Sequence, residues 1–461
     1  MADLAKGSKK LLNAWAFYDW ANSVYSLVIA SAVFPIFYGT LFSRANVETV
    51  TVFGGAIRST PLITYTTAAA FLCVAIMSPL LSGVADYVGN KKNFMKFFCY
   101  LGGLSCIALY FFSLENIYIS LLSYFFGLIG FWGSLVFYNS YLPDIAHKEQ
   151  QDRISAKGYS LGYIGSVILL ILNLAMVMFP GVFGFDISIP QSIADTGTDA
   201  EIATAMETAK GAASIKAMQV SFITVGIWWI GFAQYSFYFL PKGYKTTHKV
   251  TTKVLFNGFK ELKSVYNSLS ENIKLKRYLA AFFVYSMAVQ TVMLVATYFG
   301  EQEIGWGGDD EKTLGLIVSI LIIQLVAVVG AVLTSRASSK FGNIPTLIVI
   351  NLVWVIICVV AYFISAPIQF YITAGFVGLV MGGIQSLSRS TYSKFLPQTK
   401  DTTSYFSFYD VAEKIGIVVG MLLYGIIDQV TGSMRNSILF LVLFFAIGVF
   451  LLFRVPKNTT T

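Results

Sequence analysis

Long apolar runs, separated by short polar gaps, recur along almost the whole chain. One membrane crossing by a helix takes about 20 apolar residues, and each run is at least close to that length. Only 12% of the 461 residues are charged, about half of the roughly 25% usual in soluble proteins. We therefore predict an all-α integral membrane protein with twelve spanning helices, at residues 11–42, 60–85, 94–114, 117–141, 158–180, 217–240, 277–300, 313–335, 343–365, 368–392, 405–428 and 435–454.

A polar, lysine-rich stretch at residues 241–276 divides these helices into two sets of six. The pattern predicts an N-terminal bundle (1–240), a linker (241–276) and a C-terminal bundle (277–461). Within the linker, the string VLFNGFKELKSVYNSL has apolar residues at helical spacing. This spacing predicts an amphipathic helix lying on the membrane surface.

Three short signals recur in order at an offset of 253 or 254 residues, which indicates duplication of a six-helix unit. They pair Gly89 with Gly342, Leu142 with Leu396, and Gly162 with Gly416.

Basic residues are distributed unevenly between the two sets of loops. With the N-terminus inside, 25 Lys and Arg residues fall on the inner side and six on the outer side. Cytoplasmic loops carry such an excess. The sequence thus predicts that both termini are cytoplasmic, and it explains the net charge of +8 without a nucleic-acid partner.

The residues that commonly hold metals or catalyse reactions are scarce. The four cysteines lie in apolar runs with no CxxC pair, and the two histidines lie in polar gaps. We expect no metal site, no cofactor and no enzymatic activity. In the gap at 181–216, Thr198 and Glu201 predict a capping box for a short helix.

Charges inside the apolar runs are the main functional candidates, because each costs at least about 2.5 kcal/mol in the membrane unless it is paired or hydrated. Asp410, Glu413 and Lys414 lie at i, i+3 and i+4 near the start of helix 405–428. They could handle protons or solute. They could also form a structural lock, either among themselves or with Lys91 and Lys92.

Asp19 lies on a polar stripe of the first helix. The stripe also includes Tyr18 and Asn22, and lipid would penalise it. This stripe could face a water-filled cavity or lie in the interfacial aromatic belt. We prefer the cavity. Arg389, on one face with Gln385, could bind a solute carboxylate or neutralise Asp19 or Asp410. Asn139 and Gln290 are further polar candidates.

Close helix packing is predicted at two GxxxG patterns, Gly378 with Gly382 and Gly416 with Gly420.

The string SGVADYVGNKKNFMKF, between the second and third helices, resembles the loop signature of the major facilitator superfamily. Asp86, Gly89, Lys91 and Lys92 are the matching residues, and the resemblance implies a gating loop. A plain topological turn is the alternative. The second copy has Ser339 where the acid would stand, so only the first half could form the charged latch.

Four further strings, YDWANSVYS, YNSYLPDIA, GGIQSLSRS and FYDVAEKIG, sharpen the resemblance. Together they are similar to the branch that contains the autophagy-related vacuolar amino-acid effluxers and their bacterial relatives. The resemblance implies two six-helix bundles related by pseudo-twofold symmetry, with helices 1, 4, 7 and 10 lining a central cavity. It also implies amino-acid efflux for the fungal members only.

We therefore expect a secondary transporter that moves a small polar solute, such as an amino acid or similar zwitterion, by alternating access. Proton coupling is expected, and export is favoured by the resemblance. The expected setting is the bacterial inner membrane, with a monomer embedded in the lipid bilayer. An uncoupled facilitator or channel, and a membrane scaffold without transport, remain the alternatives.

Overall fold

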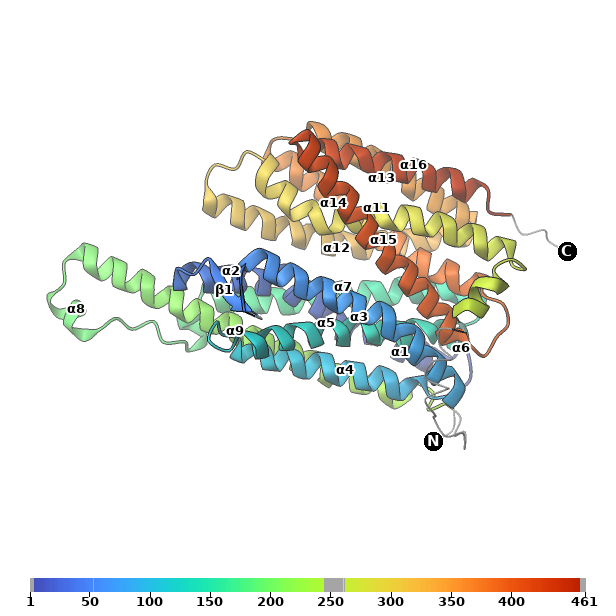
Figure 1. Cartoon of the computed structure of the whole chain (residues 1–461), viewed down its shortest axis with the longest axis horizontal. Coiled ribbons are helices and arrows are strands. Elements are labelled where there is room, and N and C mark those ends of the chain that lie inside the picture. Colours follow the sequence, from blue (N-terminus) through green and yellow to red (C-terminus); the bar gives the residue numbers. More distant parts are fainter. Residues whose placement is uncertain (1–3, 53, 244–259, 261, 457–461) are drawn as a thin grey trace.

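The computed structural model describes residues 4–52, 54–243, 260 and 262–456. Within these ranges, helices make up nearly all of the regular structure, and one two-stranded hairpin accompanies them. Figure 1 shows the helices of the N-terminal half, in blue to green, packed beside those of the C-terminal half, in yellow to red.

The N-terminal half contains the following elements: α1 (Lys9–Val24), the π-helix η1 (Tyr25–Ala32), α2 (Val33–Ala45), β1 (Thr49–Val52), β2 (Gly55–Arg58), α3 (Ser59–Val88), α4 (Lys91–Ala108), the 3-10 helix η2 (Leu109–Phe111), α5 (Ile117–Ser140), α6 (Leu142–Ile145), α7 (Lys148–Met178), the 3-10 helix η3 (Pro180–Phe183), α8 (Gln191–Thr196) and α9 (Asp199–Phe239). The C-terminal half contains α11 (Ile273–Glu303), α12 (Asp309–Phe341), α13 (Asn343–Phe363), α14 (Pro367–Phe395), α15 (Thr402–Thr431) and α16 (Met434–Phe453).

The long helices run back and forth between two ends of the molecule (Figure 1). We call the end where α1 begins and α16 stops the terminal end, and the opposite end, where β1 and β2 lie, the hairpin end. In the described part of the chain, eleven helices are long and apolar enough to cross a membrane. The 30-residue α15 accompanies them as the twelfth. The predicted twelve-helix, all-α membrane fold is confirmed.

The first predicted helix, 11–42, is not one continuous α-helix. At Tyr25 it changes to an eight-residue π-helix, and α2 resumes the α-helical form. Ser26 Oγ donates to the Ser23 carbonyl and Ser31 Oγ to the Ser26 carbonyl, both at 2.9 Å. Such side-chain bonds compete with the backbone ladder and bend helices. The predicted span is confirmed, since Lys9–Ala45 forms one helical stretch, and these side-chain bonds accompany the change of helix type within it.

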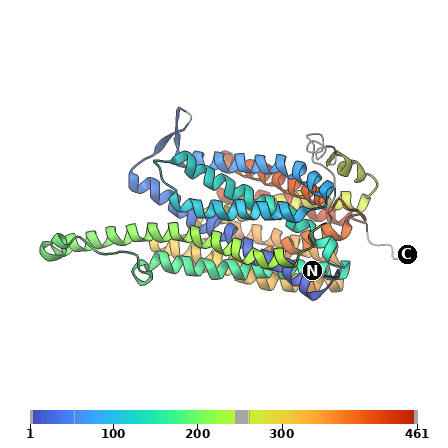
Figure 2. The ribbon, with the colours of Figure 1, turned by 90° about the horizontal axis from the view of Figure 1, so that it is seen from below.

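The sixth spanning helix is much longer than its predicted range, 217–240. The predicted capping box is present: Thr198 Oγ1 accepts from the Glu201 N–H at 3.3 Å, and Glu201 Oε2 accepts from the Thr198 N–H at 2.8 Å. However, the helix that it caps is not short and separate, because it continues for 41 residues as α9. At 1.5 Å per residue α9 spans about 60 Å, so its first part projects beyond the bundle at the hairpin end (Figure 2).

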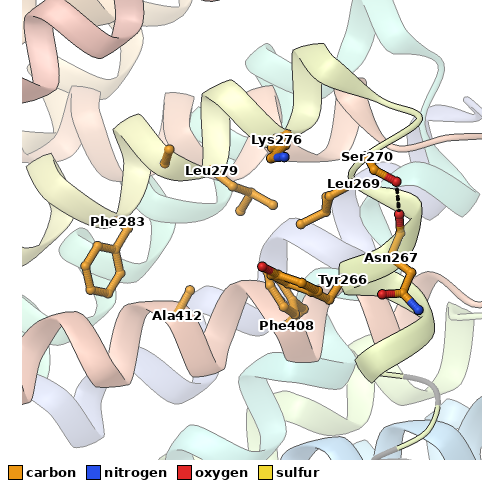
Figure 3. A pocket seen from close by; sticks show the side chains of 10 residues that line it. Tyr266, Asn267, Leu269, Ser270, Lys276, Leu279, Phe283, Phe408 and Ala412 are labelled. Atoms are coloured by element: carbon orange, nitrogen blue, oxygen red, sulfur yellow. Dashed lines mark hydrogen bonds between the residues drawn. The ribbon is translucent and has the colours of Figure 1, made fainter.

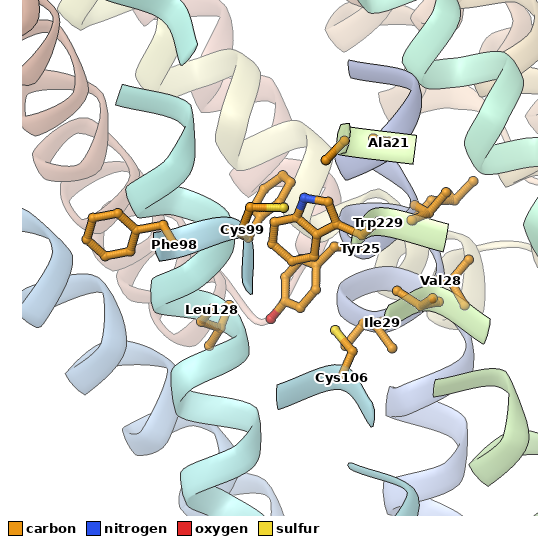
Figure 4. Close-up of a cluster of buried hydrophobic side chains, with 14 of the residues drawn as sticks. Ala21, Tyr25, Val28, Ile29, Phe98, Cys99, Cys106, Leu128 and Trp229 are labelled. Atoms are coloured by element: carbon orange, nitrogen blue, oxygen red, sulfur yellow. The ribbon is translucent and has the colours of Figure 1, made fainter. Parts of the chain in front are cut away.

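Each half has its own cluster of buried apolar side chains. In the first cluster, Tyr25 and Trp229 lie among buried side chains that include Cys99, Cys106 and Phe98 (Figure 4). All four cysteines are free thiols, and three of them are buried. α7 contributes Val167 to the first cluster and Tyr163 to the second, so this helix packs against both halves.

Glycines bring several helices into backbone contact, as the GxxxG patterns predict. A Cβ atom on Gly378 would lie 3.0 Å from the Cα of Ile323, and one on Gly382 would lie 3.0 Å from the Cα of Ala327. Both contacts join α14 to α12. On α15, a Cβ at Gly420 would lie 2.8 Å from Met287 of α11. Only glycine allows these close approaches.

The linker 241–276 is described in part. Residues 262–268 are helical, whereas 244–259 and 261, which hold the start of the predicted amphipathic helix, lie outside the described residues. Val265 and Leu269 are buried against the core of the C-terminal half, and Tyr266 is 66% exposed.

We predict opposite effects of alanine at two glycines. Gly382→Ala places a methyl group against the backbone of Ala327 and lowers stability by about 1–3 kcal/mol. Gly425→Ala on α15 meets no atom within 4 Å and raises helix stability by up to about 1 kcal/mol. The midpoints of thermal unfolding in detergent test this pair, and equal midpoints for the two variants would contradict the close α12–α14 contact.

Candidate functional site

Arg389 on α14 pairs with Asp19 on α1, and this ion pair joins the two halves of the protein. Asp19 Oδ2 accepts from Arg389 Nη2 at 3.2 Å and from Nη1 at 3.3 Å. The sequence analysis offered a solute carboxylate, Asp19 or Asp410 as the partner of Arg389. In the structure the partner is Asp19.

The other donors of the guanidinium are also used. Arg389 Nε donates to Ser155 Oγ at 2.9 Å, and Nη2 donates to the Ser155 carbonyl at 3.0 Å. Nη1 donates to Asn139 Oδ1 at 3.2 Å. Together with the two bonds to Asp19, these contacts employ all five N–H groups of the side chain. Each of these partners belongs to the N-terminal half.

Aromatic side chains surround the ion pair. The guanidinium carbon lies 4.2 Å from the ring centre of Tyr159, 4.9 Å from Trp15 and 5.4 Å from Tyr138. Such cation–π contacts are favourable, and more so away from water. Tyr138 also donates its hydroxyl to Asp19 Oδ2 at 2.8 Å. The lack of a side chain at Gly158 leaves room here, since a Cβ atom would collide with that carboxylate oxygen.

Both members of the pair are removed from solvent: Asp19 is 4% exposed and Arg389 is 2% exposed. Removing one partner of a buried ion pair usually costs about 3–5 kcal/mol, because the other charge is left uncompensated. Separating the two halves at this point is therefore unfavourable unless other charges replace the pair.

The stripe on the first helix does not face open water in this structure. Tyr18 is fully buried, with its ring 5.0 Å from that of Tyr138, and Asn22 is 1% exposed. The Nδ2 group of Asn22 has no hydrogen-bond partner among the described residues. In this structure the stripe is shielded from lipid because other side chains of the protein cover it. Among the described residues, it does not line a water-filled cavity.

The charges on α15 form a second cluster, in which Asp410 and Lys414 are buried and Glu413 is partly buried. Lys414 Nζ lies 2.9 Å from Asp410 Oδ1 and 3.2 Å from Glu413 Oε2. Gln290 Nε2 on α11 donates to Glu413 Oε1 at 3.0 Å. These three charged residues pair with one another, which is one of the two structural locks that the sequence suggested. They do not pair with Lys91 or Lys92.

This cluster also touches the N-terminal half. Lys414 Nζ lies 3.7 Å from the ring centre of Trp132 on α5. Ser78 Oγ on α3 donates to Asp410 Oδ2 at 3.5 Å. Nearby, Gln385 on α14 accepts from the Tyr163 hydroxyl at 2.7 Å. All three contacts cross between the halves.

Asp86 lies at the terminal end and caps a helix of the other half. Its carboxylate accepts from the backbone N–H of Thr403 at 3.3 Å, and from the N–H and hydroxyl of Ser404 at 2.8 Å each. The first N–H groups of a helix lack intrahelical partners and carry partial positive charge. Asp86 satisfies these groups at the start of α15.

The other residues of the predicted gating loop, Gly89, Lys91 and Lys92, lie near Asp86 at the terminal end. Gly89 ends α3 with φ at 68°, a left-handed conformation that glycine adopts readily. Lys91 pairs with Asp144 and donates to Thr402 Oγ1 at 3.0 Å. Lys92 donates to the Leu240 carbonyl, next to the end of α9, at 2.7 Å.

Asp152 supplies a second carboxylate that crosses between the halves at the terminal end, and the sequence analysis missed it. It accepts from Lys394 Nζ at 2.6 Å, from Ser338 Oγ at 2.9 Å and from Asn343 Nδ2 at 3.0 Å. The loop between α12 and α13, which lacks an acid of its own at Ser339, thus receives one from α7.

The omission has a simple cause. The sequence predicts the fifth helix over 158–180, whereas α7 begins at Lys148, so Asp152 and Ser155 lie outside the predicted range. Tyr138 was missed because an aromatic residue in an apolar run gives no polar signal. The string KEQQDRISAK, residues 148–157, contains neither glycine nor proline and is compatible with an earlier start for α7.

No group of three or more His, Cys, Asp or Glu side chains suited to holding a metal ion is present in the part of the chain that the structure describes. The arrangement suits charge pairing and exchange of ion-pair partners.

Comparison with known sequences gives matches over the full chain. A family model described as "Vacuole effluxer Atg22 like" matches residues 7–460. The "Uncharacterized MFS-type transporter YxiO" of Bacillus subtilis is 31% identical over 458 residues, covering 99% of this chain and 97% of that protein. Autophagy-related protein 22 of Vanderwaltozyma polyspora is 23% identical over 525 residues, covering 98% and 92%.

Solved structures with a similar fold include several transport proteins. The human organic anion transporter MFSD10 (TETRAN) aligns with a TM-score of 0.66 at 11% identity, covering 96% of this chain and 99% of that one. FucP in the outward conformation aligns with a TM-score of 0.65 at 13% identity, covering 97% and 99%. At these identities the likeness concerns the fold.

We predict that Asp152 holds the terminal ends of the two halves together. Asp152→Ala removes charge-assisted hydrogen bonds, which are each worth about 1.5–3 kcal/mol. The reporter is a cysteine at Ser386, which is 2% exposed where α14 meets α7, in a background without the native cysteines. A membrane-impermeant maleimide should label it about tenfold faster in the variant.

Glu149→Gln is the matched control, since Glu149 is exposed and lies one turn away on α7. It should leave the labelling rate unchanged. Equal rates for Asp152→Ala and the unsubstituted reporter would show that Asp152 does not hold the halves together.

Proposed function

Because the chain belongs to the Atg22-like family of the major facilitator superfamily, and is therefore a membrane transporter rather than an enzyme, we propose that it works by secondary active transport. The proposed cargo is a small polar solute, an amino acid or similar zwitterion, and the proposed direction is export. The family description, which names an effluxer, supports that direction.

The observation that carries this proposal is the buried Arg389–Asp19 pair between the halves. Alternating access requires contacts of this kind to break and re-form. A zwitterion presents both charges needed for replacement: its carboxylate can take the place of Asp19 beside Arg389, and its ammonium can take the place of Arg389 beside Asp19. Bound solute then offsets the cost of separating the halves, whereas the empty transporter stays closed at this point.

Asn139, Gln385, Tyr18 and Asn22 belong to the same proposed solute site. Asn139 already accepts a hydrogen bond from the guanidinium, and the Nδ2 group of Asn22, which has no partner among the described residues, is a donor available to a polar solute. A solute that accepts this bond gains a contact that the empty protein lacks.

We assign proton coupling to the cluster on α15. Asp410 and Glu413 share the single ammonium group of Lys414, so the fully ionised cluster carries one net negative charge at a largely buried position. One added proton neutralises it, and neutral groups are less costly to bury. Gln290 orients the Glu413 carboxylate through its hydrogen bond.

The terminal end is proposed to be the cytoplasmic gate of a monomer in a bacterial inner membrane. Asp86 and Asp152 bridge the halves there, with Gly89, Lys91 and Lys92 shaping the first loop. The proposed moving bodies are residues 1–240 and 277–461, joined by the linker 241–276. The excess of basic residues at this end supports a cytoplasmic location.

Proteoliposomes test the solute site. Purified protein is reconstituted, and counterflow of radiolabelled amino acids is measured without any pH gradient. We expect Asp19→Asn and Arg389→Gln each to lower counterflow at least about tenfold, because each leaves one buried charge without its partner. Asp428→Asn, at the hairpin end of α15, is the carboxylate control and should transport normally.

An imposed pH gradient tests the coupling. The unsubstituted protein should accumulate amino acid against its concentration gradient, while Asp410→Asn and Glu413→Gln should retain counterflow and lose this accumulation. Flux that ignores the pH gradient in the unsubstituted protein would identify an uncoupled facilitator. If no amino acid, peptide or sugar moves under any gradient, the carrier proposal fails in favour of a scaffold.

A further inference from the structure

A cavity of about 460 Å³ lies at the terminal end of the C-terminal half, away from the proposed solute site. Its walls are α11, α15 and the helical residues 262–268. Figure 3 shows these elements and the side chains that point into the space between them. The volume falls in the range of about 300–1,000 Å³ that is typical of pockets for small ligands.

The lining changes from polar to apolar with depth. Asn267, Ser270 and Lys276 lie at the terminal end of the groove, before or within the first turn of α11, and Lys276 is the only charged residue among the described residues of the lining. Phe283 is seven residues further along α11, which places its backbone about 10 Å deeper. The deeper part has an apolar wall that also includes Phe408 and Ala412 of α15.

The groove opens on the lipid-facing side of the protein. Ala412 shares a helical face with Ile415, one turn deeper on α15. Ile415 is 50% exposed and Val418 is 51% exposed. Exposed aliphatic side chains in the middle of a membrane-spanning helix face hydrocarbon, so the groove continues a surface that lipid chains contact.

Fixed contacts close both ends of the groove. At depth, a Cβ atom on Gly416 would lie 3.6 Å from the Phe283 carbonyl oxygen, so α15 and α11 touch there. At the terminal end, the hydroxyls of Ser268 and Tyr405 are 2.9 Å apart and attach the 262–268 helix to α15. The groove is thus a built feature of the C-terminal half.

We propose that this groove binds an anionic phospholipid. One acyl chain lies between α11 and α15 against Phe283, Phe408 and Ala412, and the phosphate lies beside the ammonium of Lys276. The depth profile of the lining matches the order of a phospholipid, with a charged headgroup at the membrane surface and hydrocarbon below it. Among the described lining residues there is one positive charge and no acidic residue, which favours a lipid with net negative charge over a zwitterionic one.

Photo-crosslinking in lipid bilayers tests the proposal. Full-length protein is reconstituted in phosphatidylcholine vesicles that contain a trace of either phosphatidylglycerol or phosphatidylcholine with the same diazirine-bearing acyl chain. Labelled peptides are then mapped by mass spectrometry. We expect labels to concentrate on the α11 and α15 segments that line the groove, with several-fold more labelling by phosphatidylglycerol.

Variants separate the two parts of the site. Lys276→Gln should remove the preference for phosphatidylglycerol while chain labelling persists. Ala412→Trp should fill the groove and suppress labelling by both lipids, and Ala280→Trp provides the same test from α11 if the first variant does not fold. Lys340→Gln, at an exposed lysine in the last turn of α12, should change nothing.

Three results would overturn the proposal. Labelling spread evenly over the lipid-facing surface would show that lipid does not bind specifically in the groove. Loss of the headgroup preference in excess inorganic phosphate would identify a simple anion site. Crosslinks between two copies of the chain at this groove would make a second protomer the occupant. None of these readouts requires transport, so they are independent of the proposed function.

Discussion

Arg389 keeps its positive charge in any environment that a protein provides, and here it lies between two helical bundles with almost no access to water. Its position can be tolerated only because Asp19 neutralises it and because every N–H group finds an acceptor. Those acceptors come from α1, α5 and α7. One buried charge therefore determines how the C-terminal half sits against the N-terminal half.

The other contacts between the halves follow the same chemistry. Asp86 caps α15, Asp152 collects donors from α12, α13 and α14, and Lys414 lies against Trp132. Each brings a charged group of one half to a complementary group of the other. Polar contacts of this kind can be exchanged for bonds to water or solute, whereas the interdigitated apolar cores within each half cannot. The difference favours movement between the halves over movement within them.

Much of the site could be predicted from the sequence because charge in an apolar run is conspicuous. Asp19, Arg389, Asp410, Glu413 and Lys414 were all identified in this way, and the structure brings Asp19 and Arg389 together over 370 positions of separation. Tyr138 and Ser155, which complete the pair's surroundings, carry no such signal. Asp152 was lost through a boundary error of ten residues, since helix starts are weakly marked where the first turns are amphipathic.

By itself, the sequence determined that this is a twelve-helix membrane protein with a few buried charges, because hydropathy and charge are properties that each segment carries locally. Only the tertiary structure decided that Arg389 pairs with Asp19, that Lys414 remains with its neighbours on α15, and that Asp86 caps a helix of the other half. The choice of partner depends on which helix faces meet. That choice is set by glycine contacts, such as those of Gly382 and Gly158, and by the π-helical turn of η1, none of which a hydropathy pattern records.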